Sequence, residues 1–247
     1  MILRTEALVL RWYPVTDSSR IIVWFTRAHG QITTLIRGSQ RPKSYTLGQY
    51  DLFYTCELLY YAKAKEDLHI LRECSPIVRR SDLRSNWRAA AAASFIADFL
   101  YRVSIPRHPQ RDVYQVATAV LDVISDRKAV NPAALLWFEL QLHALNGVGA
   151  VGPERYQPGW LFHVANGGWI DPGHPQATQG EALSPGSAAQ LHFLQCAPDL
   201  QTALRTKLSQ QQVREISTVL GKFTNVHLHV HVPSRDYALD LLYRKLR

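Results

Sequence analysis

The sequence of 247 residues has little that could build a disulfide framework, a thiolate metal site or a membrane span. Its three cysteines are too few and too widely spaced for a disulfide scaffold or a four-thiolate site, and they are Cys56, Cys74 and Cys196. Its longest apolar stretch, residues 89–103, is interrupted by two charged residues, which excludes a membrane span. The amino terminus lacks the charged segment and apolar core of a secretory signal, so we expect a cytoplasmic protein.

Charged residues are also scarce, at 19% of the chain, but they are unbalanced: 28 lysines and arginines face 20 acidic residues, a net charge of +8. With 47% hydrophobic residues, this composition excludes a disordered or fibrous protein. Residues 1–80 hold 12 basic and 7 acidic residues, and therefore carry +5 of the total. Because this excess favours polyanions, nucleic acid is the first partner to consider.

The same part of the chain holds ten of the 25 aromatic residues. Basic grooves with aromatic platforms hold single-stranded nucleic acid, because cations neutralise the phosphates while bases stack on the rings. Aromatic residues are also common in strands and in cores, so most of the ten are expected to be buried.

The first 75 residues alternate between apolar and polar positions in the manner of β-strands. Five short strands with one long basic loop favour a small closed barrel, for which the OB-fold is the usual five-stranded architecture. The expected strands are Glu6–Trp12, Arg20–Thr26, Gln31–Arg37, Tyr50–Tyr61 and Leu68–Glu73.

After Pro76 the apolar period becomes helical. Ser81 is the expected cap of the first helix, and Asn131 with Pro132 is the expected start of the third, which Gly147 ends. The expected helices are Asp82–Val103, Arg111–Asp126, residues 132–146, Ser187–Cys196, Asp199–Leu208, Gln210–Thr224 and Asp236–Leu246. The fold class is therefore α+β, with a barrel domain at residues 1–78 and a mostly helical domain at 79–247.

Residues 147–185 interrupt the helical region and hold eight of the 13 glycines and five of the 13 prolines. This density predicts an irregular insertion, with room for a small hairpin across Trp160–Ile170. Soft metal ligands in or beside it are Cys196, His163, His174 and His192, and their spacing does not match a zinc ribbon.

The clearest local feature is the segment from Ile36 to Ser44, in which Arg37, Arg41 and Lys43 are interleaved with Gly, Pro and Ser. Such a loop at a strand end can reach phosphates with its long side chains, while hydroxyl and N–H groups add hydrogen bonds. A solvated turn would have the same composition, so the two readings remain open at this point.

A second feature is the alternation of His227, His229 and His231 with aliphatic residues. On a strand the three imidazoles would share one face, but a metal site would need a fourth ligand from elsewhere. On a helix they would point in different directions. The chain has no nucleophile elbow, phosphate-binding glycine loop or recognisable pair of catalytic acids, so we expect neither an enzyme nor a metal or other cofactor.

Taken together, these features resemble the RecO family of bacterial recombination and repair mediators. The basic segment Arg37–Ser44 is similar to the family's K-G-A-R-R-P-K-S-like loop, with arginine at the first position and Gln40 in place of a cation. The other N-terminal positions that carry the resemblance are Glu6–Arg11, Asp17, Ile21–Val23, Phe25, Thr26, Gly30, Gly48–Phe53 and Leu71–Glu73. Later positions are Leu83, Arg84, Phe138–Leu140, Ser234 and Arg235.

The resemblance implies an OB-fold joined to a helical domain with a zinc-ribbon-like insertion. It implies binding of single- and double-stranded DNA, strand annealing, and loading of RecA, together with RecR, onto strands covered by single-strand binding protein, in the cytoplasm at the nucleoid. Many members carry four cysteines in the insertion, whereas residues 147–185 contain none, so the insertion must be held by other contacts such as Trp160, Phe162 and Trp169.

On this hypothesis the cations of the basic loop contact phosphates, and other residues extend the surface. The expected DNA-binding residues are Arg37, Arg41 and Lys43, then Arg11, Arg20 and Lys65, with Tyr45 or Tyr50 for stacking. The alternatives are a protein-interaction adaptor in which DNA contact is incidental, and a metal-dependent enzyme built on the three histidines at 227, 229 and 231.

Overall fold

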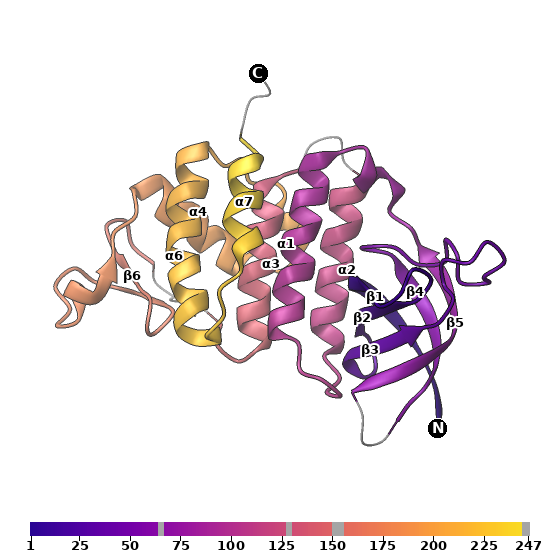
Figure 1. Cartoon of the computed structure of the whole chain (residues 1–247). Helices are drawn as coiled ribbons and strands as arrows, with labels where there is room; N and C mark the ends of the chain where they lie inside the picture. Colours follow the sequence, from indigo (N-terminus) through magenta and orange to yellow (C-terminus); the bar gives the residue numbers. More distant parts are fainter. Residues whose placement is uncertain (64–66, 127–129, 150–155, 244–247) are drawn as a thin grey trace. The chain divides into compact units, whose positions relative to one another are not determined.

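A computed structural model describes residues 1–63, 67–126, 130–149 and 156–243 (Figure 1). The chain divides into two compact units, residues 1–126 and residues 127–247. The first unit holds a barrel and two long helices, and the second is helical apart from one small sheet, so the predicted α+β class is confirmed. No helix within these residues is both long and apolar enough to cross a membrane.

The first unit is built on a closed five-stranded barrel with the strand order β1-β2-β3-β5-β4. The strands are β1 (Ile2–Pro14), β2 (Arg20–Thr26), β3 (Gly30–Ile36), β4 (Thr55–Tyr61) and β5 (Leu68–Val78). Neighbours are antiparallel except β3 and β5, which pair in parallel. This topology confirms the expected OB-type barrel.

The first strand is longer at both ends than expected, and the third is displaced by one residue. The fourth and fifth strands differ from the expectation for local reasons. The fourth strand was expected from Tyr50 but begins at Thr55, because the preceding residues form turns and Phe53 has a φ of 67°. A left-handed residue cannot continue a strand. The fifth strand continues past Pro76, because the ladder to β4 accommodates the proline through a shift in register.

The barrel core follows the alternation of the strands. Along β3, Ile32, Thr34 and Ile36 are buried while the intervening residues lie on the outer face. Thr34 is tolerated inside because its hydroxyl accepts a hydrogen bond of 2.8 Å from the Trp24 indole N–H. Trp24 in turn meets the Tyr50 ring edge-on, at 6.5 Å between centroids. Burying an aromatic of this size contributes about 2–3 kcal/mol.

The same unit continues into a 3-10 turn (Ser81–Arg84) and two helices, α1 (Trp87–Val103) and α2 (Arg111–Asp126). The expected cap at Ser81 is wrong: Asn86 caps α1, and its side chain accepts a hydrogen bond from the Ala89 N–H. The chain turns at the buried Arg80, which has a φ of 47° and donates to Asp122 of α2 and to the Phe53 carbonyl. These long-range bonds hold the barrel against α2.

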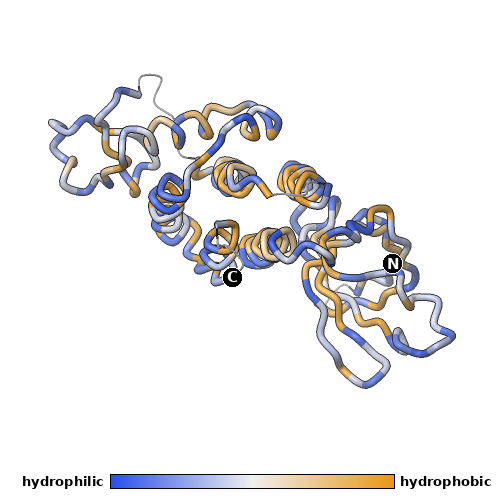
Figure 2. Tube along the Cα trace, turned by 90° about the horizontal axis from the view of Figure 1, so that it is seen from above, coloured by the Kyte–Doolittle hydropathy of each residue, from blue (hydrophilic) through white to orange (hydrophobic). Residues whose placement is uncertain are grey.

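The second unit contains five helices within its described residues, with apolar residues along the helices and mostly polar residues in the connecting loops (Figure 2). They are α3 (Pro132–Leu145), α4 (Pro185–Cys196), α5 (Leu200–Ala203), α6 (Gln210–Leu228) and α7 (Pro233–Leu241). The α3 helix starts and stops as predicted, with Asn131 as its cap and Gly147 at a φ of 78° beyond its end.

Four helices in this unit differ from the expected bounds. The α4 helix begins at Pro185, two residues before the expected start. The α5 helix is a single turn, and Ser209 forms a reciprocal capping box with Gln212 that starts the next helix. The α6 helix extends four residues beyond Thr224 to Leu228. The α7 helix starts at Pro233, a residue compatible with the first turn of a helix, and ends at Leu241. Residues 244–246 of the expected helix lie outside the described residues.

A buried ion pair joins α3 to α7 in the second unit. The Arg235 guanidinium donates at 2.9 Å to both carboxylate oxygens of Glu139, which is fully buried. Thr224 of α6 donates to the same carboxylate, and Gly221 leaves room for the guanidinium, since a Cβ there would lie 3.1 Å from its Nη1. Breaking such a pair typically costs about 3–5 kcal/mol, so it fixes these helices strongly.

The insertion contains a small three-stranded sheet in the order β7-β6-β8, made of β6 (Leu161–His163), β7 (Gly168–Ile170) and β8 (Gly180–Glu181). The β6–β7 hairpin lies where it was predicted. Phe162 and Trp169 are buried and meet edge-on at 5.5 Å, whereas Trp160 is only half-buried. The Trp169 indole donates to Gln195 of α4, which ties the sheet to that helix.

Candidate nucleic-acid interface

The basic loop, residues 37–44, begins where β3 ends, and it is anchored by its small residues. Ser39 is fully buried, and its hydroxyl donates to the Ser18 carbonyl at 3.3 Å. The backbone N–H of Gln40 donates to the same carbonyl at 3.1 Å. The Gln40 amide reaches the Tyr50 hydroxyl at 3.3 Å. Two residues therefore fasten the loop to the β1–β2 turn and the barrel, while the cations beside them point outward.

The cationic side chains on this loop are exposed and are held close to one another by a glycine turn. Gly38 has a φ of 64°, a conformation that glycine adopts at low cost. Its N–H donates to the Ser19 hydroxyl at 3.4 Å. The Arg41 side chain lies across this backbone, with Cδ 3.4 Å from where a Cβ of residue 38 would be. The turn thus brings Arg41 back toward Arg37.

Most arginines of the first unit are neutralised by a carboxylate. Their ion pairs are Arg4–Glu57, Arg11–Asp98, Arg27–Glu6, Arg72–Glu73, Arg80–Asp122, Arg84–Asp51, Arg102–Asp98 and Arg107–Asp67. In contrast, Arg37, Arg41 and Lys43 form no ion pair with any carboxylate of the described residues. Three uncompensated cations within seven residues make this loop a concentrated positive site in the unit, and such a site attracts phosphate.

A cavity of about 490 Å³ lies beside these cations. Its lining comes from the β1–β2 turn, from the end of β3 and from the basic loop, and consists of Val15, Thr16, Ser19, Leu35, Arg37, Gly38 and Arg41. OB-folds bind oligonucleotides with the face of strands 2 and 3 and the loop between strands 1 and 2, which matches the origin of this lining. Four of these lining residues, Val15, Thr16, Ser19 and Leu35, were not expected from the sequence. Their position in the first barrel turn and at the end of the third strand is the signal that could have found them.

The structure separates the two weaker arginine candidates. Arg20 lies at the root of the basic loop, paired in register with Ile36, and its guanidinium stacks over the Trp12 ring at 4.0 Å. The Arg11 guanidinium bonds to the Asp98 carboxylate and stacks on the Tyr101 ring, so its charge is compensated within the unit. The structure therefore places Arg20 beside the loop, whereas Arg11 is paired within the unit.

The remaining candidate residues differ in how exposed their side chains are. Tyr45 is 70% exposed, and its hydroxyl donates to the Arg72 carbonyl at 3.0 Å, so its ring is available beside the loop. Tyr50 is only 7% exposed and packs against Trp24 in the barrel core, so the expectation that it could stack on a base is wrong. Lys65 lies outside the described residues.

The two barrel cysteines support the end of the long β3–β4 connection. Cys56 and Cys74 are buried, and both sulfur atoms lie 3.6 Å from the Gln49 carbonyl oxygen, to which their S–H groups can donate. Hydrogen bonding to Cys74 and burial raise the pKa of the Cys56 thiol. A thiol kept protonated is a poor nucleophile and a poor metal ligand, so this pair fits a packing role.

The histidine alternation does not form a strand. His227 belongs to α6, where its ring packs on Phe223 at 4.3 Å and its Nε2 lies 2.9 Å from the Val164 carbonyl oxygen. His229 ends the helix at a φ of 53°, and His231 lines a cavity beyond it. The described part of the chain contains no group of three His, Cys, Asp or Glu residues placed to hold a metal ion. Of the two alternatives left open by the sequence, the helical one holds for His227, and the three histidines do not line one face of a strand.

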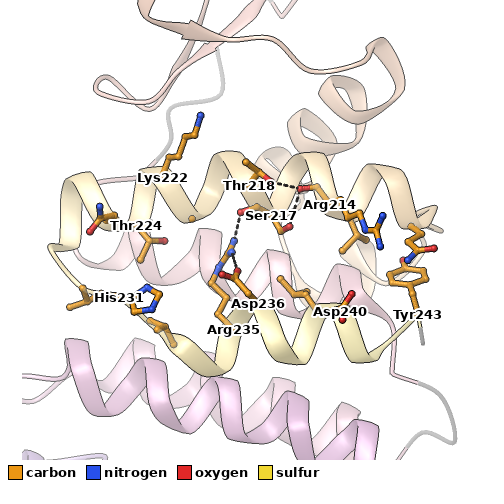
Figure 3. A pocket seen from close by; sticks show the side chains of 17 residues that line it. Arg214, Ser217, Thr218, Lys222, Thr224, His231, Arg235, Asp236, Asp240 and Tyr243 are labelled. Carbon is orange, nitrogen blue, oxygen red and sulfur yellow. Dashed lines mark hydrogen bonds and ion pairs between the residues drawn. The ribbon is translucent and has the colours of Figure 1, made fainter. Parts of the chain in front are cut away.

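The second unit contains a larger cavity, of about 730 Å³, between α6 and α7 (Figure 3). Its cations are largely engaged: Arg235 bonds Glu139, Asp236 and the Ser217 carbonyl, and Lys222 bonds Glu181 at 2.6 Å. Arg214 also lines this cavity and forms no ion pair with a carboxylate of the described residues. The cavity lining thus contains one unpaired arginine, whereas the basic loop carries three unpaired cations within seven residues.

The closed five-stranded barrel and its loop of exposed cations define a protein of the OB-fold class. The family model "Recombination protein O N terminal" matches residues 1–79, and "Recombination protein O C terminal" matches residues 84–236. The chain therefore belongs to the RecO family of DNA repair proteins.

Several curated proteins named "DNA repair protein RecO" are similar to this chain along most of their length. The protein from Desulfatibacillum aliphaticivorans is 26% identical over 97% of each chain. The one from Syntrophus aciditrophicus (strain SB) is 23% identical over 89% of this chain and 88% of its own. The one from Salinibacter ruber (strain DSM 13855 / M31) is 25% identical over 95% and 92%, respectively.

Proposed function

We propose that this chain is a DNA-binding recombination mediator that acts without making or breaking covalent bonds. It binds single- and double-stranded DNA through the basic loop and anneals complementary strands. With RecR, it helps to load RecA onto DNA covered by single-strand binding protein, in the cytoplasm at the nucleoid. The observation that carries the proposal is the cluster of three cations on an OB-fold loop of a RecO-family chain, none of which pairs with a carboxylate of the described residues.

Annealing follows from charge neutralisation alone. Arg37, Arg41 and Lys43 reach phosphates with long side chains, and Arg20 extends the same surface at the root of the loop. Two strands whose phosphates are partly neutralised repel each other less, while their base edges stay free to pair. Exposed Tyr45 adds a ring on which a base can stack.

The test is a double charge reversal in the loop. Arg37→Glu with Arg41→Glu should weaken binding to oligonucleotides of any sequence, single-stranded or duplex, and flatten the salt dependence, because phosphate contacts carry no sequence information. The matched control is Arg79→Glu with Arg111→Glu, two exposed arginines of the same unit that also lack a carboxylate partner in its described residues. Fluorescence anisotropy at low salt measures both variants.

If both double variants bind like the wild type, the loop is not the DNA site. The proposal would then give way to a protein-interaction adaptor. Capture of RecR and single-strand binding protein by the wild-type chain, with and without nuclease, separates these functions, because an adaptor retains its partners when DNA is removed.

A further inference from the structure

The cavity beside the basic loop has a composition that phosphate binding does not explain. A seat for phosphate alone needs cations and N–H or O–H donors, yet two of the lining residues are the aliphatic Val15 and Leu35. Val15 is 50% exposed in the β1–β2 turn. Leu35 lies on the outer face of β3, where its other outward neighbours are Gln31 and Thr33.

The aliphatic wall continues across the strands. Leu35 is directly opposite Ile21 of β2 and Ile70 of β5, and both are only partly buried. An apolar strip on the outer face of a barrel, bordered by two unpaired arginines, can contact a flat, weakly polar ring while the attached charge is neutralised beside it.

The polar groups in the cavity retain hydrogen-bond donors. The Thr16 hydroxyl accepts from the Ser19 N–H at 3.1 Å, and the Ser19 hydroxyl accepts from the Gly38 N–H. Each hydroxyl oxygen is thus oriented by a backbone donor, and each keeps its own proton to donate. Arg37 and Arg41 add planar guanidinium groups on the same side, which can bond a phosphate or lie flat against a base.

We infer that this cavity receives one unpaired nucleotide of a DNA strand, with its base against Val15 and Leu35 and its phosphates on Arg37, Arg41 and the two hydroxyls. The volume lies within the range of about 300–1,000 Å³ that is typical for small-molecule sites. This inference rests on the proposed DNA binding and deepens it, because it gives the same site a preference for single strands.

The preference arises from base stacking. In a duplex every base is paired and stacked, so placing one in the cavity requires it to be flipped out. A single strand meets a much smaller barrier and gains a base contact in addition to its phosphate contacts. The cavity therefore strengthens single-strand binding, whereas the cations act on both forms of DNA.

The experiment removes the aliphatic wall without changing charge. The double variant V15S/L35T replaces both side chains by small polar ones, and V15S alone alters only an exposed turn residue and leaves the barrel intact. The control is V226S, the same substitution at a valine of α6 that is 45% exposed. The probes are a short oligothymidylate, the same strand with abasic sites at its centre, and a duplex of equal length.

We expect V15S/L35T to bind the intact single strand about tenfold more weakly, which is the effect of one lost base contact. V15S should show a smaller loss in the same direction, while both variants and V226S bind the duplex like the wild type. The wild type should bind the abasic strand about tenfold more weakly than the intact one, and V15S/L35T should no longer distinguish them.

The inference is overturned if the wild type binds abasic and intact strands equally, or if V15S/L35T loses single-strand and duplex affinity to the same extent. Either outcome is compatible with a cavity that only seats phosphate. Failure of the proposed function gives a different pattern, in which the charge-reversal variant R37E/R41E binds all three probes as the wild type does.

Discussion

The number of phosphates that the basic loop neutralises can be counted from the salt dependence of binding. Replacing Arg37, Arg41 and Lys43 together by glutamine removes three cations that have no carboxylate partner among the described residues. Each neutralised phosphate contributes about 0.7 to the slope of log K against log salt for a single strand, so the slope should fall by about 2.1. Between about 50 and 200 mM salt, wild-type affinity should therefore drop about 18-fold more than that of the variant.

Fluorescence anisotropy titrations of one labelled oligonucleotide at several salt concentrations give both slopes. The control removes three arginines that are already paired, Arg4→Gln, Arg27→Gln and Arg84→Gln, whose partners are Glu57, Glu6 and Asp51. This control loses the same number of cations but should keep the wild-type slope. A decrease of less than about 0.7 in the loop variant, equivalent to one phosphate, would refute the assignment of three contacts.

Two further predictions concern stability and are measured by urea denaturation of the full chain. Burial lowers the pKa of His143 from 6.5 to about 4. Between these two pH values the His143 side chain therefore binds a proton in the unfolded chain but not in the folded chain. The free energy of unfolding should then fall by about 3 kcal/mol as the pH is lowered from 6.5 to 4. His143→Gln should remove this loss, and a variant that loses as much stability as the wild type would contradict the assignment to His143. Gly30→Ala should cost more than about 2 kcal/mol, because at a φ of 62° its Cβ would lie 2.3 Å from the Ile105 carbonyl oxygen. Gly48→Ala, at a φ of 73° with no atom within 4 Å, should cost only about 1 kcal/mol, and equal losses would show that the collision is relieved elsewhere.

Elements whose signals are local were predicted closely from the sequence. The strand Arg20–Thr26 and the helix Arg111–Asp126 have the expected bounds, because alternation and helical period are properties of the segment itself. The start of the first long helix was missed because Ser81 and Asn86 are both favoured capping residues, and the sequence alone does not choose between them. The turn that precedes Asn86 contains Arg80, which bonds to Asp122, 42 residues away. Local patterns carry no information about such a contact.

The histidine run shows a related limit. Its alternation with aliphatic residues resembles a strand, but the apolar positions Val213, Ile216, Leu220 and Phe223 set a helical phase that continues to Leu228. The buried face of the preceding helix therefore accounts for the first residues of the run, up to Leu228, and the chain leaves the helix at His229. A pattern over seven residues was overridden by one that extends over nineteen.

The candidate site was only partly visible in the sequence. Composition indicated the basic loop, but whether a cation is free or paired depends on carboxylates that are distant in the chain. Arg11 and Asp98 are 87 residues apart, and only the fold brings them together. The aliphatic wall was invisible for the same reason, because Val15 and Leu35 are unremarkable in sequence and meet only where the barrel brings turn and strand side by side.

The insertion shows how a segment of this kind holds together without cysteines. Phe162 and Trp169 pack edge-on at the centre of the small sheet, Tyr156 lies 4.8 Å from Trp169, and Phe223 of α6 meets Phe162 at 6.0 Å. Aromatic pairs of this geometry contribute about 0.5–1.5 kcal/mol each beyond their burial. Since these contacts reach α4 and α6 through Gln195 and Phe223, the sheet is stabilised by the helices beside it, where a metal-bound ribbon would be stabilised from within.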